Sequence, residues 1–194
     1  MTESVLDFLL QRRSSRPAML GEPGPGAGEI RRILQAAARV PDHKKLAPWR
    51  FVVLEGEARA KFGDRVAAVF QREDPQGSSE VRLETERERF LRAPVVIAVV
   101  SRIIPEKVPE IEQRLSTGAV CMNLCLAANA LGYGTSWITE WTAFSPGVKQ
   151  VLGLGENEDV AGFIYIGTAS EQQADRDRPD VDEITTHWQA PAQG

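Results

Sequence analysis

Three arginines and two serines lie within five residues near the start of the chain, in the run Arg12-Arg13-Ser14-Ser15-Arg16. Guanidinium groups bind phosphate through paired hydrogen bonds, and neighbouring hydroxyl groups can complete its coordination. The same cations at the C-terminal end of a helix would instead stabilise that end through the helix dipole. The run therefore indicates a phosphate site or a capped helix end, and both interpretations stay open at this point.

A second group of charged residues spans positions 39 to 51 and reads RVPDHKKLAPWRF. Its two prolines stiffen the segment, and the apolar residues after it predict a strand. A stiff, positive loop at the edge of a sheet suits an anionic ligand. The alternative is a solvated connection in which Trp49 anchors the loop to the core.

Positive charge is concentrated in the first quarter of the chain. Between positions 11 and 50, nine lysines and arginines oppose three acids, although the whole chain of 194 residues carries a formal net charge of −4. Because nucleic-acid binding depends on extended positive surfaces, this distribution argues against a nucleic-acid partner. It favours a small anion such as a phosphate monoester.

Several other chemistries are excluded by what the sequence lacks. The two cysteines, at positions 121 and 125, cannot by themselves supply a disulfide framework or a four-ligand zinc site, and the two histidines, His43 and His187, lie far from them in sequence. The sequence contains no phosphate-binding P-loop and no nucleophile elbow. The N-terminal charge order is opposite to that of a secretory signal, and the uncharged stretch 115–139 carries polar residues that disfavour a membrane span. We therefore expect a cytoplasmic protein without a metal or a membrane anchor.

Hydrophobic periodicity predicts helices near residues 5–12, 29–40, 59–70, 118–131 and 145–152, and strands near 50–54, 95–100, 135–138 and 160–168. The fold class expected from this order is α+β, with a mixed, mainly antiparallel sheet flanked by helices. The charged run 75–92 is expected to be a solvated helical face that borders the site. We expect one domain over residues 1–194, in which residues 170–194 form an extended C-terminal arm.

The predicted helix 118–131 is apolar on all sides, so it must be buried by its own domain or by a second copy of the chain. Cys121 and Cys125 lie one turn apart on it, and core packing accounts for both. Trp188 near the end of the polar C-terminal arm also indicates that the arm docks on another surface. A dimer would satisfy both features.

Four motifs in order, RRSSR, RVPDHKKLAPWRF, GYGTSW and FIYIGT, resemble the FMN-dependent nitroreductase family. The resemblance is strongest to its short, YdjA-like NAD(P)H nitroreductases and covers nearly the whole chain. It implies a homodimer with an exchanged C-terminal arm, in which two FMN molecules bind at the subunit interface and NAD(P)H is the electron donor.

The resemblance also assigns residues. The matching positions are Arg12, Arg13 and Ser14 at the FMN phosphate, Arg39 and His43 reaching the flavin from the partner subunit, and Trp137, Ile138 and Thr139 beside the isoalloxazine ring. Arg176 or Arg178 would complete the phosphate site, and residues 127–132 match a stretch that contacts the nicotinamide dinucleotide. Lys45 and Ala47 stand where longer relatives carry Asn and Gln, so hydrogen bonding to the flavin ring must be supplied differently.

The activity implied by the resemblance is ping-pong hydride transfer from NAD(P)H through the flavin to a nitroaromatic, a quinone or a similar electron-poor acceptor. Since a flavin carries such chemistry itself, no catalytic side chain is expected. Three alternatives stay open. The first is another flavin enzyme on the same fold, such as a dehalogenase, an enoate reductase or a flavin-fragmenting enzyme. The other two are a non-catalytic flavin-binding protein and an interaction protein without a cofactor.

Overall fold

The computed structural model describes residues 4–189 and divides the chain into two units. One unit combines residues 4–13 with residues 173–189, and the other is Ser14–Gln172. The expectation of one domain over residues 1–194 stays a prediction. Among residues 4–189, no helix combines the length and the apolar composition that a membrane span requires.

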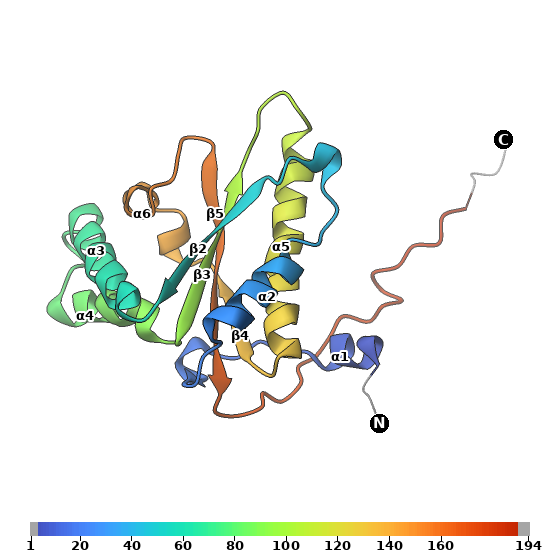
Figure 1. Cartoon of the computed structure of the whole chain (residues 1–194), viewed down its shortest axis with the longest axis horizontal. Coiled ribbons are helices and arrows are strands. Elements are labelled where there is room, and N and C mark those ends of the chain that lie inside the picture. Colours follow the sequence, from blue (N-terminus) through green and yellow to red (C-terminus); the bar gives the residue numbers. More distant parts are fainter. Residues whose placement is uncertain (1–3, 190–194) are drawn as a thin grey trace. The chain divides into compact units, whose positions relative to one another are not determined.

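The larger unit is built on a five-stranded sheet (Figure 1). Its strands are β1 (Leu20–Gly21), β2 (Trp49–Glu55), β3 (Val95–Arg102), β4 (Gly134–Ile138) and β5 (Glu158–Ala169). The order is β1-β5-β3-β2, with β4 also paired to β5, and each of these pairs is antiparallel. The predicted α+β class is confirmed, and the sheet is antiparallel at every described pair rather than mixed.

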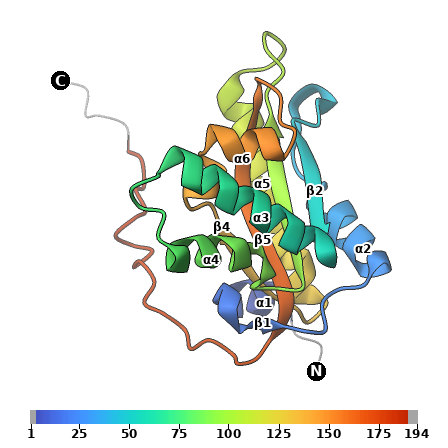
Figure 2. The same cartoon turned by 90° about the vertical axis from the view of Figure 1, so that its left-hand side faces the viewer.

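Helices cover both faces of this sheet (Figures 1 and 2). On one face lie α2 (Ala27–Ala37) and α5 (Glu110–Ala130), and on the other lie α3 (Glu57–Glu73), α4 (Glu80–Glu88) and α6 (Pro146–Val151). Strand β3 is buried on both sides: Val96 and Ala98 pack in the α3 layer, whereas Ile97 and Val99 pack in the α5 layer. A strand with two covered faces needs a continuous apolar run, as the sequence VVIAVV has.

Helix α5 begins earlier than predicted. The prediction relied on a run of apolar residues, whereas the first two turns of the helix carry charged residues. Its own sheet buries one face, which includes Val120 and Leu124. On the opposite face, Ile111 is 62% exposed and Leu115 is 65% exposed. The domain therefore covers only one side of α5, and burial of the other side by a second copy stays a prediction.

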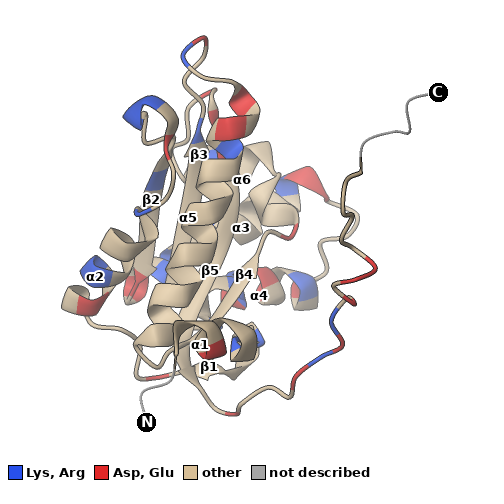
Figure 3. Ribbon diagram, turned by 90° about the vertical axis from the view of Figure 1, so that its right-hand side faces the viewer, with Lys and Arg blue, Asp and Glu red and all other residues tan. Residues whose placement is uncertain are grey.

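The expectation that residues 75–92 form a solvated face is wrong for part of the segment. Figure 3 shows charges of both signs on α4, but Glu86 is 0% exposed and Arg89 is 7% exposed. Arg89 donates to the Glu86 carboxylate through Nε at 2.5 Å and through Nη2 at 2.7 Å. Because the two charges neutralise each other through paired hydrogen bonds, the fold can bury them together.

Both cysteines are buried on α5, as core packing predicts. Burial raises the pKa of the Cys121 thiol to about 12. We therefore expect a thiol-specific disulfide reagent at pH 8 to modify neither cysteine in the native protein, because the reactive species is the thiolate. Spectrophotometric titration should detect two thiols once denaturant is added. Rapid modification of the native protein would contradict this placement.

The smaller unit contains α1 (Val5–Gln11), which begins at a capping box between Ser4 and Asp7. The helix ends at Gln11, so the basic run follows the helix. Arg12 already has φ −55° and ψ 128°, outside the helical region. Within residues 173–189 the structure has neither helix nor strand, and Trp188 is 80% exposed. Docking of this arm on a partner stays a prediction.

Candidate functional site

Two of the predicted phosphate ligands meet in the smaller unit. The guanidinium of Arg13 donates to the carbonyl oxygen of Ala174 and forms an ion pair with Asp175 Oδ1 at 3.5 Å. Arg178 Nη2 donates to the same Oδ1 at 2.8 Å. The Arg178 guanidinium and then the backbone N–H of Arg176 hold the pKa of the Asp175 carboxyl below its usual value.

The positions of these two arginines show whether their guanidinium groups could bind one phosphate together. Arg13 and Arg178 lie 165 positions apart in sequence by their numbers, yet both guanidinium groups face one carboxylate oxygen. A carboxylate and a phosphate present similar oxyanions to a guanidinium fork. The donor set therefore suits an anionic phosphate group that takes the place of the Asp175 carboxylate. Arg12 directly precedes Arg13 as the C-cap of α1, and Ser14 begins the larger unit.

The loop between α2 and β2 has a strained backbone. Lys44, Lys45 and Ala47 have φ values of 61°, 56° and 46°, a left-handed region that side-chain-bearing residues rarely adopt. The Asp42 carboxylate accepts hydrogen bonds from the backbone N–H groups of Leu46 at 3.1 Å and Ala47 at 2.8 Å. Strain of this kind persists where the surroundings hold it and is concentrated at functional sites. The Asp42 carboxylate therefore supports this unusual backbone, and the stiffness of the loop stays a prediction.

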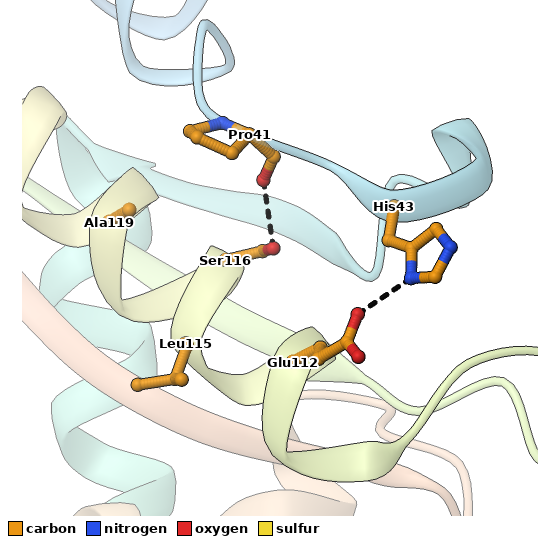
Figure 4. Close-up of a pocket in the computed structure, with 6 residues that line it drawn as sticks. All are labelled: Pro41, His43, Glu112, Leu115, Ser116 and Ala119. Carbon is orange, nitrogen blue, oxygen red and sulfur yellow. Dashed lines mark hydrogen bonds and ion pairs between the residues drawn. The ribbon is translucent and has the colours of Figure 1, made fainter.

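His43 leaves this loop beside a pocket of about 310 Å³ (Figure 4). Its Nδ1 lies 2.6 Å from Glu112 Oε2 on α5. Ser116 Oγ, one turn further along α5, donates to the carbonyl oxygen of Pro41 at 2.8 Å. These two contacts hold the loop against α5. Arg39 precedes the loop, its side chain is exposed, and its carbonyl oxygen accepts from Asn123 Nδ2 at 3.0 Å.

The contact with Glu112 selects one tautomer of His43. A carboxylate only accepts hydrogen bonds, so Nδ1 must carry the hydrogen and a neutral ring presents the lone pair of Nε2. We expect Glu112→Ala to shift the neutral ring toward the Nε2–H form by roughly tenfold, since hydrogen bonds to charged groups contribute about 1.5–3 kcal/mol. Nitrogen-15 NMR measures this directly, because the chain has only two histidines.

Glu110→Ala is the matched control for that experiment. Glu110 lies on the same turn of α5, but its carboxylate pairs with Arg114 at 2.6 Å instead of with a histidine. Its removal should leave the nitrogen-15 signals of His43 in place, and exposed His187 supplies an internal reference. An unchanged His43 tautomer in Glu112→Ala would show that Glu112 does not orient the ring.

The segment Trp137-Ile138-Thr139 lies at the end of β4. Trp137 is 40% exposed, and its Nε1 donates to the carbonyl oxygen of Ala161 at 3.2 Å. A side chain at Gly162 would collide with this indole, because a Cβ there would stand 2.0 Å from Nε1. The Thr139 carbonyl oxygen accepts from Thr142 Oγ1 at 3.2 Å. Both ends of the segment are therefore held by neighbouring polar groups.

Sequence reasoning missed three acidic residues that contact predicted site residues or adjoin them. They are Glu112 beside His43, Asp175 between Arg13 and Arg178, and Glu140 directly after Thr139. Glu112 and Asp175 reach partners far away in sequence, so no local pattern reveals them. Glu140 could be suspected only from its place at the end of a strand.

Comparison with known proteins agrees with this architecture. The model of the nitroreductase family matches residues 9–168. The Escherichia coli K12 protein named "Putative NAD(P)H nitroreductase YdjA" is 37% identical over 165 residues, which cover 84% of this chain and 87% of that protein.

Two solved structures share the fold. The nitroreductase-like family protein from Bacillus cereus has a TM-score of 0.86 at 24% identity, covering 98% of each chain. A nitroreductase from Desulfovibrio desulfuricans in complex with FMN has a TM-score of 0.74 at 23% identity, covering 98% of this chain and 100% of that one. The family match spans most of the sequence, and the chain belongs to the nitroreductase family.

Proposed function

We propose that this protein is an FMN-dependent NAD(P)H oxidoreductase that reduces nitroaromatic, quinone or similar electron-poor acceptors. The observation that carries the proposal is the convergence of Arg13 and Arg178 on one carboxylate oxygen, because it is an arrangement that suits a phosphate-bearing cofactor. The FMN bound to the D. desulfuricans relative and the NAD(P)H in the name of the E. coli relative support the choice of cofactor and donor.

In this proposal the chain binds and orients the cofactor. Arg12, Arg13 and Ser14 hold the phosphate, and Arg178 completes the site in preference to Arg176, because the Arg178 guanidinium already shares Asp175 with Arg13. Bound FMN supplies hydride transfer from NAD(P)H to the acceptor in ping-pong fashion. The segment 137–139, whose two ends are held by hydrogen bonds, supports the isoalloxazine ring.

The proposed assembly is a homodimer in which Arg39 and His43 reach the flavin of the partner subunit. The exposed apolar side chains of Ile111 and Leu115 on α5 support it, since they form a surface that a second copy would cover. Glu112 and Ser116 act on the loop that carries His43, and they keep it in one orientation. With Nδ1 donating to Glu112, a neutral His43 ring can accept a hydrogen bond at Nε2 at the interface.

The test is an absorbance spectrum of the purified protein, followed by anaerobic titration with NADH and with NADPH. We expect flavin absorption that bleaches with at least one of the two donors and returns when a quinone or a nitroaromatic is added. Flavin that no donor reduces would indicate a non-catalytic flavin-binding protein. Colourless protein that does not bind added FMN would overturn the proposal.

A further inference from the structure

A second pocket, of about 250 Å³, lies between α4 and the loop after β4. Its lining is rich in arginine and consists of Arg82, Thr85, Arg89, Arg92 and Glu140. The sequence motifs of the proposed flavin site include none of these residues. Three guanidinium groups around one small pocket form an unusual surface for an acidic protein. Whether an anion can bind there depends on how many of their positive charges are already neutralised by carboxylates.

The charges around this pocket do not balance. Glu86 lies beneath it, fully buried, and contacts both Arg89 and Arg82, the latter at 2.9 Å from its Oε1. Glu140 at the rim pairs with Arg89 and, at 3.4 Å, with Arg92. Two carboxylates therefore face three guanidinium groups, which leaves one positive charge. An incoming anion would neutralise it.

Arg82 has N–H donors that remain available for a ligand. An arginine has five N–H donors, and the closest contact of the Arg82 guanidinium with Glu86 is made through Nη2. Within residues 4–189, its other guanidinium N–H groups have no protein acceptor. The guanidinium also lies over the ring of Phe70, with its central carbon 5.1 Å from the ring centre. This stacking orients a planar fork while leaving its edge available.

The pocket adjoins the proposed flavin site through Glu140. This residue follows Thr139 directly and has φ 50° and ψ −169°, a backbone region that is ordinarily restricted to glycine. Its carboxylate is held by Arg89 and Arg92, so the same arginines that line the pocket also hold the strained end of the 137–139 segment. A ligand lying along that segment would have the arginine pocket beside it.

We infer that this pocket binds an oxyanion carried by a substrate of the proposed reaction, with the Arg82 fork as its main contact. The inference rests on the proposed function. Two substrates could supply the group: an acceptor with a carboxylate, or the nicotinamide donor with its 2′-phosphate. A carboxylate and a phosphate each present two oxygens on one central atom, and these can accept two parallel hydrogen bonds from a guanidinium group.

Matched substrate pairs test the inference with the FMN-loaded protein. The acceptor pair is 4-nitrobenzoate and 4-nitrobenzamide, and the donor pair is NADPH and NADH. For each pair the measured quantity is the ratio of the two kcat/KM values. We expect Arg82→Gln to lower the ratio for one pair, the anionic member losing roughly tenfold relative to its partner. The pair that responds identifies the source of the oxyanion.

Arg87→Gln is the control, because Arg87 is on the same helix but pairs with Glu80 and Glu84 away from the pocket. Its two ratios should equal those of the wild type. If Arg82→Gln leaves both ratios unchanged within twofold, the inference is overturned.

A separate measurement distinguishes this failure from failure of the proposed function. If the wild type turns over neither nitro compound with either donor, the ratios cannot be formed, and the anaerobic flavin titration described above decides the proposed function separately. Calorimetric titration of the purified protein with benzoate and with inorganic phosphate then determines whether the pocket binds an oxyanion. Binding of either probe that Arg82→Gln weakens about tenfold would support an oxyanion site, and the absence of binding to the wild type would overturn it.

Discussion

Arg12→Ala combined with Arg13→Ala is expected to yield protein that is purified without FMN. Each arginine would lose a hydrogen bond to a charged phosphate, and such bonds contribute about 1.5–3 kcal/mol each. The two losses together correspond to an increase in the dissociation constant of FMN of roughly a hundredfold or more. Fluorescence titration of FMN into the stripped protein measures the constant, and the ratio of flavin absorbance to protein absorbance measures occupancy.

Arg31→Ala combined with Arg32→Ala is the control, because it removes the same number of adjacent arginines, at exposed positions. These residues lie on α2 and have no proposed role at the flavin. The control should retain stoichiometric flavin, which separates a specific phosphate contact from a general loss of positive charge. Stoichiometric yellow flavin in the Arg12/Arg13 variant would refute the assignment of the phosphate site to this run.

The second large effect is expected for Arg89→Met. This substitution leaves the Glu86 carboxylate buried without its bidentate partner, and breaking a buried ion pair from one side costs about 3–5 kcal/mol of unfolding free energy. For a chain of this size, the midpoint of thermal unfolding should fall by on the order of 10 °C. Differential scanning calorimetry or a urea titration measures the change.

Arg87→Met, on the last turn of α4 and two residues before Arg89, supplies the comparison. Its ion pairs with Glu80 and Glu84 are exposed, and exposed pairs contribute at most about 1 kcal/mol. If Arg89→Met lowers the unfolding free energy no more than Arg87→Met does, the buried ion pair stabilises the fold no more than an exposed pair. Arg89→Met combined with Glu86→Leu should recover much of the loss of unfolding free energy, because it also removes the buried carboxylate that Arg89 no longer neutralises.

The pH dependence of stability follows from the same pair. Burial raises the pKa of Glu86, but the hydrogen bonds and charge of Arg89, together with the Trp141 hydrogen bond and the charge of Arg82, hold the pKa below the usual value of 4.5. A carboxyl whose folded pKa is depressed stabilises the native state above its unfolded pKa, and this stabilisation is lost as pH falls through the folded pKa. Wild-type stability should therefore decline below about pH 4.5, and less steeply in Glu86→Gln, as urea titrations across pH 3–7 would show.

Most elements of the fold follow from local sequence pattern. The apolar run 95–100 predicts a strand covered on both faces, and β3 occupies that position with its side chains divided between two core layers. The predicted helix near residues 29–40 corresponds to α2, whose buried residues have helical spacing. Such patterns are reliable because burial of one face imposes its period on the residues of that element alone. Family membership likewise followed from four short motifs.

The tertiary structure alone decided which charged residues pair and which are buried. Composition suggests that the whole run 75–92 is solvated, yet Glu86 and Arg89 are buried because α4 packs them against the layer that contains Trp141. Glu112 meets His43 across 69 positions, and Asp175 meets Arg13 across 162. Local sequence determined where helices, strands and cationic runs occur, because those depend on near neighbours. Charge pairing depends on distances between remote elements, which exist only once the chain has packed.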